Sequence, residues 1–137
     1  MSLAQRFAQI FGAIYLLVGI LGFIPPLLSP APGWGPFGGF LLTLFAVNWL
    51  HSLAHIAIGV GGLATFRNPV AASSYALVVG IAYALLFILG LFGGPVGPLD
   101  GLLPLNALDN ILHLLTAVIA LVAYFASRGE PATSPRI

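Results

Sequence analysis

The chain has 137 residues, of which 60% are hydrophobic and only 5% are charged. A soluble domain carries about 25% charged residues, so this composition excludes a water-soluble globular protein and indicates an integral membrane protein in contact with a lipid bilayer. The net charge of +1 and the absence of Lys leave no basic surface for nucleic acid. The absence of Cys excludes disulfides and thiolate metal sites.

Four apolar segments predict four membrane-spanning helices in one domain over residues 1–126. Each is long enough to cross roughly 30 Å of hydrocarbon at about 1.5 Å per residue. The spans are expected at about residues 7–24, 40–66, 75–92 and 102–125. Segments rich in Pro and Gly, at residues 25–39 and 93–98, are predicted to be extramembrane loops. Residues 127–137 predict a polar cytoplasmic tail.

The arginines indicate the orientation of the chain in the membrane. Arg6, Arg67, Arg128 and Arg136 all flank one side of the four-span topology, and the opposite loops contain neither Arg nor Lys. Because cytoplasmic segments carry the excess of positive charge, both termini are predicted to be cytoplasmic. The chain is therefore expected to be a multi-pass membrane protein.

The spans also repeat in pairs, the third resembling the first and the fourth resembling the second. The matched pairs include Gly12 and Gly80, Tyr15 and Tyr83, Asn48 and Asn106, and His55 and His113. Each repeat is a two-helix hairpin of the same orientation. The sequence therefore predicts an all-α, four-helix transmembrane bundle built from two tandem helical hairpins, related by a pseudo-two-fold axis along the membrane normal. The glycines and tyrosines are expected to pack in its interior.

Two polar stripes interrupt the second and fourth spans. On a helix, residues at i, i+3, i+4 and i+7 share one face. This spacing holds for Asn48, His51, Ser52 and His55, and again for Asn106, Asp109, Asn110 and His113. An ionisable side chain deep in a membrane costs about 2.5–3.5 kcal/mol on insertion scales, so the cluster calls for a structural or functional reason.

One hypothesis for the cluster is a metal or haem site in a membrane redox protein. His51 and His55 lie one helical turn apart, as do Asp109 and His113, and this spacing lets two side chains of one helix bind one ion. Three imidazoles and one carboxylate suit transition metals such as zinc, iron or copper. A haem-type tetrapyrrole with His55 and His113 as axial ligands is a variant.

A second hypothesis is a proton relay in a channel or transporter, because chains of Asp and His inside helix bundles carry protons in pumps. A third is a non-enzymatic structural cluster, in which hydrogen bonds across helices fix their register at about 0.6 kcal/mol each. The third hypothesis is favoured, because His, Asn, Ser and Asp side chains can hydrogen-bond to one another across helices without any ligand. The sequence also carries no hydrolase or kinase motif. The protein is then a structural or accessory membrane subunit, acting within a homo-oligomer or a larger membrane complex.

Three segments, residues 7–25, 44–55 and 102–114, carry a resemblance to a known family. The second contains the pattern N-x-x-H-x-x-x-H and the third contains N-x-x-D-N-x-x-H. In these segments the chain resembles the small bacterial integral membrane proteins labelled domain of unknown function 4383. The resemblance extends over nearly the whole chain except the tail. It implies a four-helix membrane protein and no particular activity.

Overall fold

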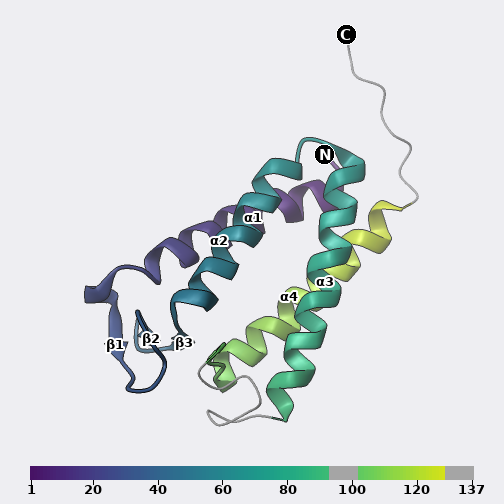
Figure 1. Cartoon of the computed structure of the whole chain (residues 1–137). Coiled ribbons are helices and arrows are strands. Elements are labelled where there is room, and N and C mark those ends of the chain that lie inside the picture. Colours follow the sequence, from purple (N-terminus) through teal and green to yellow (C-terminus); the bar gives the residue numbers. More distant parts are fainter. Residues whose placement is uncertain (93–101, 129–137) are drawn as a thin grey trace.

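The structure is a computed structural model that describes residues 1–92 and 102–128, and these form four helices and a small sheet (Figure 1). The elements are α1 (Leu3–Leu21), the 3-10 turn η1 (Pro25–Leu27), β1 (Leu28–Pro30), β2 (Gly39–Leu41), β3 (Phe45–Val47), α2 (Trp49–Thr65), α3 (Pro69–Leu91) and α4 (Ala107–Ser127). The loop predicted at residues 93–98 and most of the predicted tail, with Arg136, lie outside the described residues.

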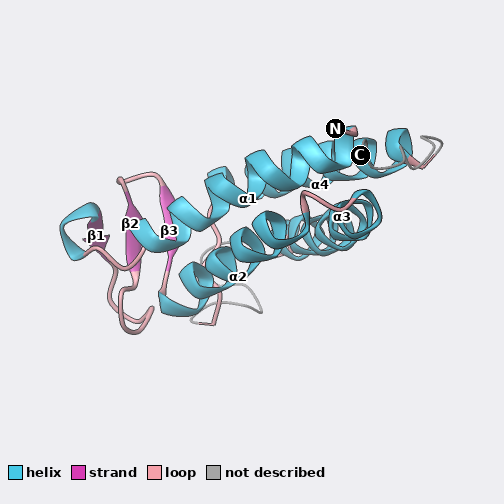
Figure 2. Cartoon of the chain, turned by 90° about the horizontal axis from the view of Figure 1, so that it is seen from above, coloured by secondary structure: helices cyan, strands magenta, loops and turns pink. Residues whose placement is uncertain are grey.

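The helices associate as two antiparallel pairs. α1 packs along α2 and α3 packs along α4, and these contacts are more extensive than those between the pairs (Figures 1 and 2). Among the described residues, α1, α3 and α4 are long and apolar enough to cross a membrane. α2 has only 17 residues.

Small side chains fill the interior, and large apolar side chains cover the outside. The buried alanines of the helices are Ala4, Ala8, Ala72, Ala76, Ala117, Ala120 and Ala123. Large exposed residues occur on all four helices and include Ile14, Leu17, Leu53, Val60, Val78, Leu85, Val118 and Val122. Lipid tails solvate such residues as well as a protein core does, whereas small residues let helices approach closely. This distribution fits a bundle that is surrounded by lipid.

The second and fourth helices begin later than the predicted spans 40–66 and 102–125. Asn48 is the N-cap of α2, where its Oδ1 accepts a hydrogen bond from the backbone N–H of His51 at 2.9 Å. Asn106 is the N-cap of α4, where its Oδ1 accepts a hydrogen bond from the backbone N–H of Asp109, also at 2.9 Å. An N-cap residue has a non-helical backbone, so both asparagines precede the helical stripes to which the sequence assigned them.

The first and third helices begin earlier than the predicted spans 7–24 and 75–92. Ser2 and Gln5 form a reciprocal capping box at the start of α1. Asn68 caps α3, and Pro69 occupies the first helical turn, where its missing N–H is no loss.

A three-stranded antiparallel sheet corrects the all-α prediction. β2 lies between β1 and β3, with Phe40 opposite Ala46 in the β2–β3 ladder. A tight turn joins these two strands, and it places Leu42 and Thr43 at φ values of 51° and 64°. The segment 40–47 is apolar, so it resembled the start of a membrane helix in the sequence.

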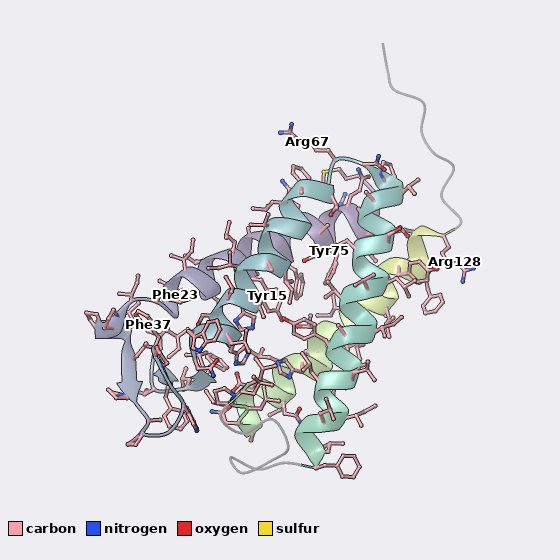
Figure 3. All side chains as sticks on the ribbon, viewed as in Figure 1. Tyr15, Phe23, Phe37, Arg67, Tyr75 and Arg128 are labelled. Carbon is pink, nitrogen blue, oxygen red and sulfur yellow. The ribbon has the colours of Figure 1, made fainter. Side chains whose placement is uncertain are left out.

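The arginines of the described residues lie at the end of the bundle opposite the sheet, here called the arginine end. Arg67 follows α2 and Arg128 caps α4, and both are labelled in Figure 3. Arg6 lies in the first turns of α1. Two hydrogen bonds join the segments at this end. The backbone N–H of Ala4 donates to Ser127 Oγ at 2.9 Å, and Gln5 Nε2 donates to the Phe66 carbonyl at 3.0 Å.

We expect Gly59→Ala to destabilise the bundle, because a Cβ at this position would overlap the backbone N and Cα of Leu16 on α1. Such overpacking costs about 1–3 kcal/mol of the free energy of unfolding. Gly61→Ala is the matched control, since its Cβ would meet only the Tyr75 ring, at 3.4 Å. Reversible unfolding in detergent measures both variants, and equal effects would contradict the close approach of α1 and α2.

Candidate functional site

Two asparagines connect α2 and α4 at the sheet end of the bundle. Asn48 Nδ2 donates to the carbonyl of Leu102 at 3.0 Å, and Asn106 Nδ2 donates to the carbonyl of Leu44 at 2.6 Å. Each accepting carbonyl lies four residues before the other asparagine. Each amide therefore caps its own helix through oxygen and binds the chain entering the other helix through nitrogen. We call this pair the crossed caps.

Asp109 joins the sheet to α4. Its Oδ2 accepts the backbone N–H of Asn106, which completes a capping box, and the backbone N–H of Ala46 on β3, both at 3.0 Å. The side chain is 4% exposed. A carboxylate at a helix N-terminus is favoured by the helix dipole and by charge-assisted hydrogen bonds. The structure thus gives this predicted metal ligand two backbone partners.

Next to the crossed caps, five rings form a closed circuit. The centroid distances are 5.1 Å for Tyr15–His55, 4.6 Å for His55–His51, 6.3 Å for His51–His113, 5.2 Å for His113–Tyr83 and 5.4 Å for Tyr83–Tyr15. Every helix of the bundle contributes at least one ring. The structure therefore brings together the three predicted histidines and the two predicted tyrosines, and Tyr15 is labelled in Figure 3.

The three imidazoles line a cavity of about 40 Å³, together with Tyr83 and apolar side chains. His51, His55 and His113 are 4%, 8% and 3% exposed. Their Nδ1 atoms are buried and have no hydrogen-bond partner among the described residues. We call this space the histidine cavity. Within the described residues, no group of three or more His, Asp or Glu side chains is arranged to hold a metal ion, so the metal hypothesis stays a prediction.

The remaining polar residues of the two stripes lie against glycines. A Cβ on Gly22 would overlap Ser52 Oγ, and a Cβ on Gly90 would overlap Asn110 Oδ1. Neither Ser52 Oγ nor Asn110 Oδ1 has a hydrogen-bond partner among the described residues. These two side chains therefore fill space that only glycine leaves open.

The predicted packing glycines lie at close contacts between helices. A Cβ on Gly12 would come within 2.9 Å of the backbone N of Leu63 on α2. A Cβ on Gly80 would come within 2.8 Å of the Leu121 side chain on α4. Both glycines thus lie at contacts between two helices, one in each helix pair.

Sequence reasoning missed two hydroxyl contacts. Tyr15 Oη and Thr116 Oγ1 share a hydrogen bond of 2.8 Å between α1 and α4. Tyr75 Oη donates to the Ile58 carbonyl at 2.9 Å, which joins α3 to α2. Thr116 lies three residues after His113, so helical spacing already places it on the polar face.

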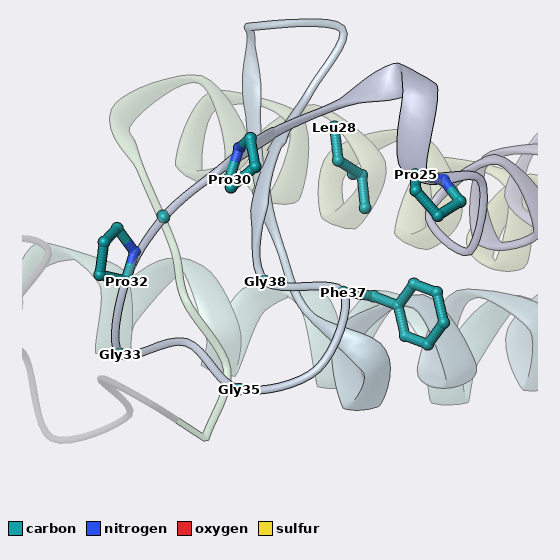
Figure 4. A pocket seen from close by; sticks show the side chains of 9 residues that line it. Pro25, Leu28, Pro30, Pro32, Gly33, Gly35, Phe37 and Gly38 are labelled. Carbon is teal, nitrogen blue, oxygen red and sulfur yellow. The ribbon is translucent and has the colours of Figure 1, made fainter.

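Two larger hollows lie at the sheet end. One, of about 600 Å³, lies beside the β1–β2 connection (Figure 4), and none of its 9 lining residues has an ionisable or hydrogen-bonding side chain. The other, of about 660 Å³, is lined by Trp34, Phe40, the N-cap Asn106 and residues of α3 and α4 that include Asn110. The ionisable side chains of the polar stripes line neither hollow, so the histidine cavity is the candidate site.

These features define a small helical membrane protein with ionisable side chains inside its bundle. Three helices can cross a membrane, and large apolar side chains cover the outside. Residues 5–126 match the family described as "Domain of unknown function (DUF4383)", and the chain belongs to this family. The resemblance noted in the sequence is thereby confirmed. No curated protein and no solved structure shows significant similarity to the chain.

We expect Asn48→Asp and Asn106→Asp each to lower the free energy of unfolding by about 1–3 kcal/mol. Asp caps a helix as well as Asn does, so only the Nδ2 donor is lost, and an acidic oxygen then faces the carbonyl of Leu102 or Leu44. Unfolding in detergent measures the change.

Asn68→Asp is the matched control for these two variants. Asn68 caps α3 through Oδ1, which accepts from the backbone N–H groups of Val70 and Ala71, and its side chain is exposed. We expect this variant to unfold within about 0.5 kcal/mol of wild type. Equal losses in all three variants would show that the amide nitrogens of the crossed caps contribute nothing.

Proposed function

We propose that this protein is a non-enzymatic structural or accessory membrane subunit, whose His/Asp/Asn cluster ties its two helix pairs together. The crossed caps carry the proposal. Asn48, Asn106 and Asp109 use their side chains to bind backbone groups of the opposite helix pair. Side chains used in this way hold the fold together and have less freedom to act on a substrate.

The contacts also support two tandem hairpins related by a pseudo-two-fold axis along the membrane normal. The Tyr15–His55 contact in one helix pair corresponds to Tyr83–His113 in the other, at 5.1 Å and 5.2 Å. A Cβ on Gly22 would overlap Ser52, and at the equivalent position a Cβ on Gly90 would overlap Asn110. The two bonds of the crossed caps are also equivalent. Each asparagine donates to the carbonyl of the leucine that lies four residues before the other asparagine. One departure from this symmetry is Asp109, which occupies the position equivalent to His51.

The arginine end is then the cytoplasmic end in our proposal, and the sheet faces the outside. All arginines of the described residues lie at one end, which is the distribution that the positive-inside rule associates with the cytoplasm. α2 spans about 25 Å at 1.5 Å per residue, which is short of a typical hydrocarbon core. β3 extends this segment toward the outer interface. The proposal therefore has both termini in the cytoplasm and four spans in a bacterial inner membrane.

Two alternative functions use the same residues. A metal-binding redox protein would use His51, His55, Asp109 and His113, and a haem-binding one would use His55 and His113. A tetrapyrrole is far larger than a cavity of about 40 Å³. A proton-coupled channel or transporter would move protons along the ring circuit, where imidazoles and phenols lie in contact. The proposed subunit role also leaves room for a homo-oligomer or a larger membrane complex as the partner.

We expect His55→Ala and His113→Ala, made singly, to lower the unfolding free energy by similar amounts, because His55 contacts Tyr15 as His113 contacts Tyr83. A loss of about 1–3 kcal/mol is typical for removing a buried side chain and leaving its neighbours unpartnered. Leu53→Ala, on the exposed face of α2, is the control.

The same preparations, purified from native membranes without chelator, are analysed for metals and for visible absorption. The structural proposal predicts no cofactor signal that depends on the histidines. A metal near one equivalent, or a Soret-type band, that is lost from only one of the two variants would contradict it. Cross-linking in native membranes then identifies a second copy or another protein as the partner.

A further inference from the structure

We propose that the histidine cavity is a binding site for water, in which one to three water molecules hydrogen-bond to the Nδ1 atoms of His51, His55 and His113. This inference rests on the proposed function, because it names the ligand that completes the polar cluster. It also distinguishes a hydrated cluster from one held together only by direct contacts between protein groups.

The first observation is that three buried polar atoms in one place lack protein partners. Each neutral imidazole has one donor and one acceptor nitrogen, and both seek partners when water is excluded. The Nδ1 atoms of all three histidines are buried without a partner among the described residues. Three unmet requirements so close together call for a shared ligand.

The second observation is the size of the cavity. Its volume is about 40 Å³, and a cavity needs roughly 10–15 Å³ to hold one water molecule. The space therefore holds one to three waters and excludes larger organic ligands. Each buried water requires two to four polar partners. Three imidazoles provide that number, so the cavity is polar enough to be wet even though its remaining walls are mostly apolar.

The third observation is the charge of the lining. No Asp or Glu is among the lining residues, and the nearby Asp109 uses Oδ2 to accept two backbone N–H groups. The site thus offers no negative charge to compensate a divalent cation. A neutral ligand that can both donate and accept hydrogen bonds fits this lining, and water is the smallest such ligand.

Ala54→Val tests the proposal through the sign of its effect, because Ala54 lines the cavity on α2. Filling a dry cavity with a larger apolar residue stabilises a protein. Filling a hydrated one displaces the water and leaves the imidazoles unpartnered, so we expect the melting temperature to fall by about 3–8 °C. Ala57→Val is the matched control, on the same helix but exposed and outside the cavity lining. It should change the melting temperature by about 1 °C or less.

A direct measurement guards against simple overpacking in Ala54→Val. Nuclear magnetic resonance on protein with ¹⁵N-labelled histidine, in detergent, should show contacts between water and the imidazoles in wild type and in Ala57→Val. These contacts should be lost in Ala54→Val. Their absence from wild type, or a higher melting temperature for Ala54→Val, overturns the proposal. A stoichiometric metal found by elemental analysis also overturns it.

The outcome is separable from that of the proposed function. If the Asn48→Asp and Asn106→Asp variants unfold like wild type while water contacts persist, the structural role of the crossed caps fails and the water site stands. If those variants are destabilised and no water is detected, the structural role stands and the water site fails.

Discussion

The crossed caps are the constraint on which the rest of this structure depends. The first turn of a helix leaves backbone N–H groups without partners, and such groups are costly where water is scarce. Asn48 and Asn106 meet this need for α2 and α4, and the same side chains bind the chain that leads into the opposite helix. The sheet is anchored through Asp109, and the ring circuit lies next to the capped ends. Capping and association of the two helix pairs are thus one set of bonds.

The arrangement of apolar residues explains how a bundle with so little apolar burial stays together. In lipid there is no hydrophobic driving force for burying Leu and Ile inside the bundle, so these residues face outward. Cohesion then comes from close helix contacts at Gly12, Gly59 and Gly80 and from a few hydrogen bonds between distant segments. Individually weak bonds matter in this setting because few other forces distinguish one helix register from another.

The sequence allowed the main features to be predicted, and its failures have physical causes. The helical spacing grouped the histidines correctly, and the Tyr–His contacts recur in both helix pairs as the matched residues suggested. The starts of α2 and α4 were misplaced because an N-cap bonds to the residue three positions later, which is also the spacing of one helical face. The apolar residues 40–47 were predicted to begin a helix, because a short apolar run does not distinguish a strand from a helix. In the structure they contribute to β2 and β3. One hypothesis included Asp109 among metal ligands, and N-x-x-D at a helix start also describes the capping box that Asp109 forms with Asn106.

α4 supplies hydrogen-bond partners for several polar groups that are synthesised long before it. α4 and the segment just before it bind Ala4, Tyr15, Ala46 and Asn48, which come from the first half of the sequence. During synthesis, the first hairpin therefore enters the membrane with several polar groups unmatched, and they remain so until α4 follows. These polar groups find their partners only once α4 has been synthesised.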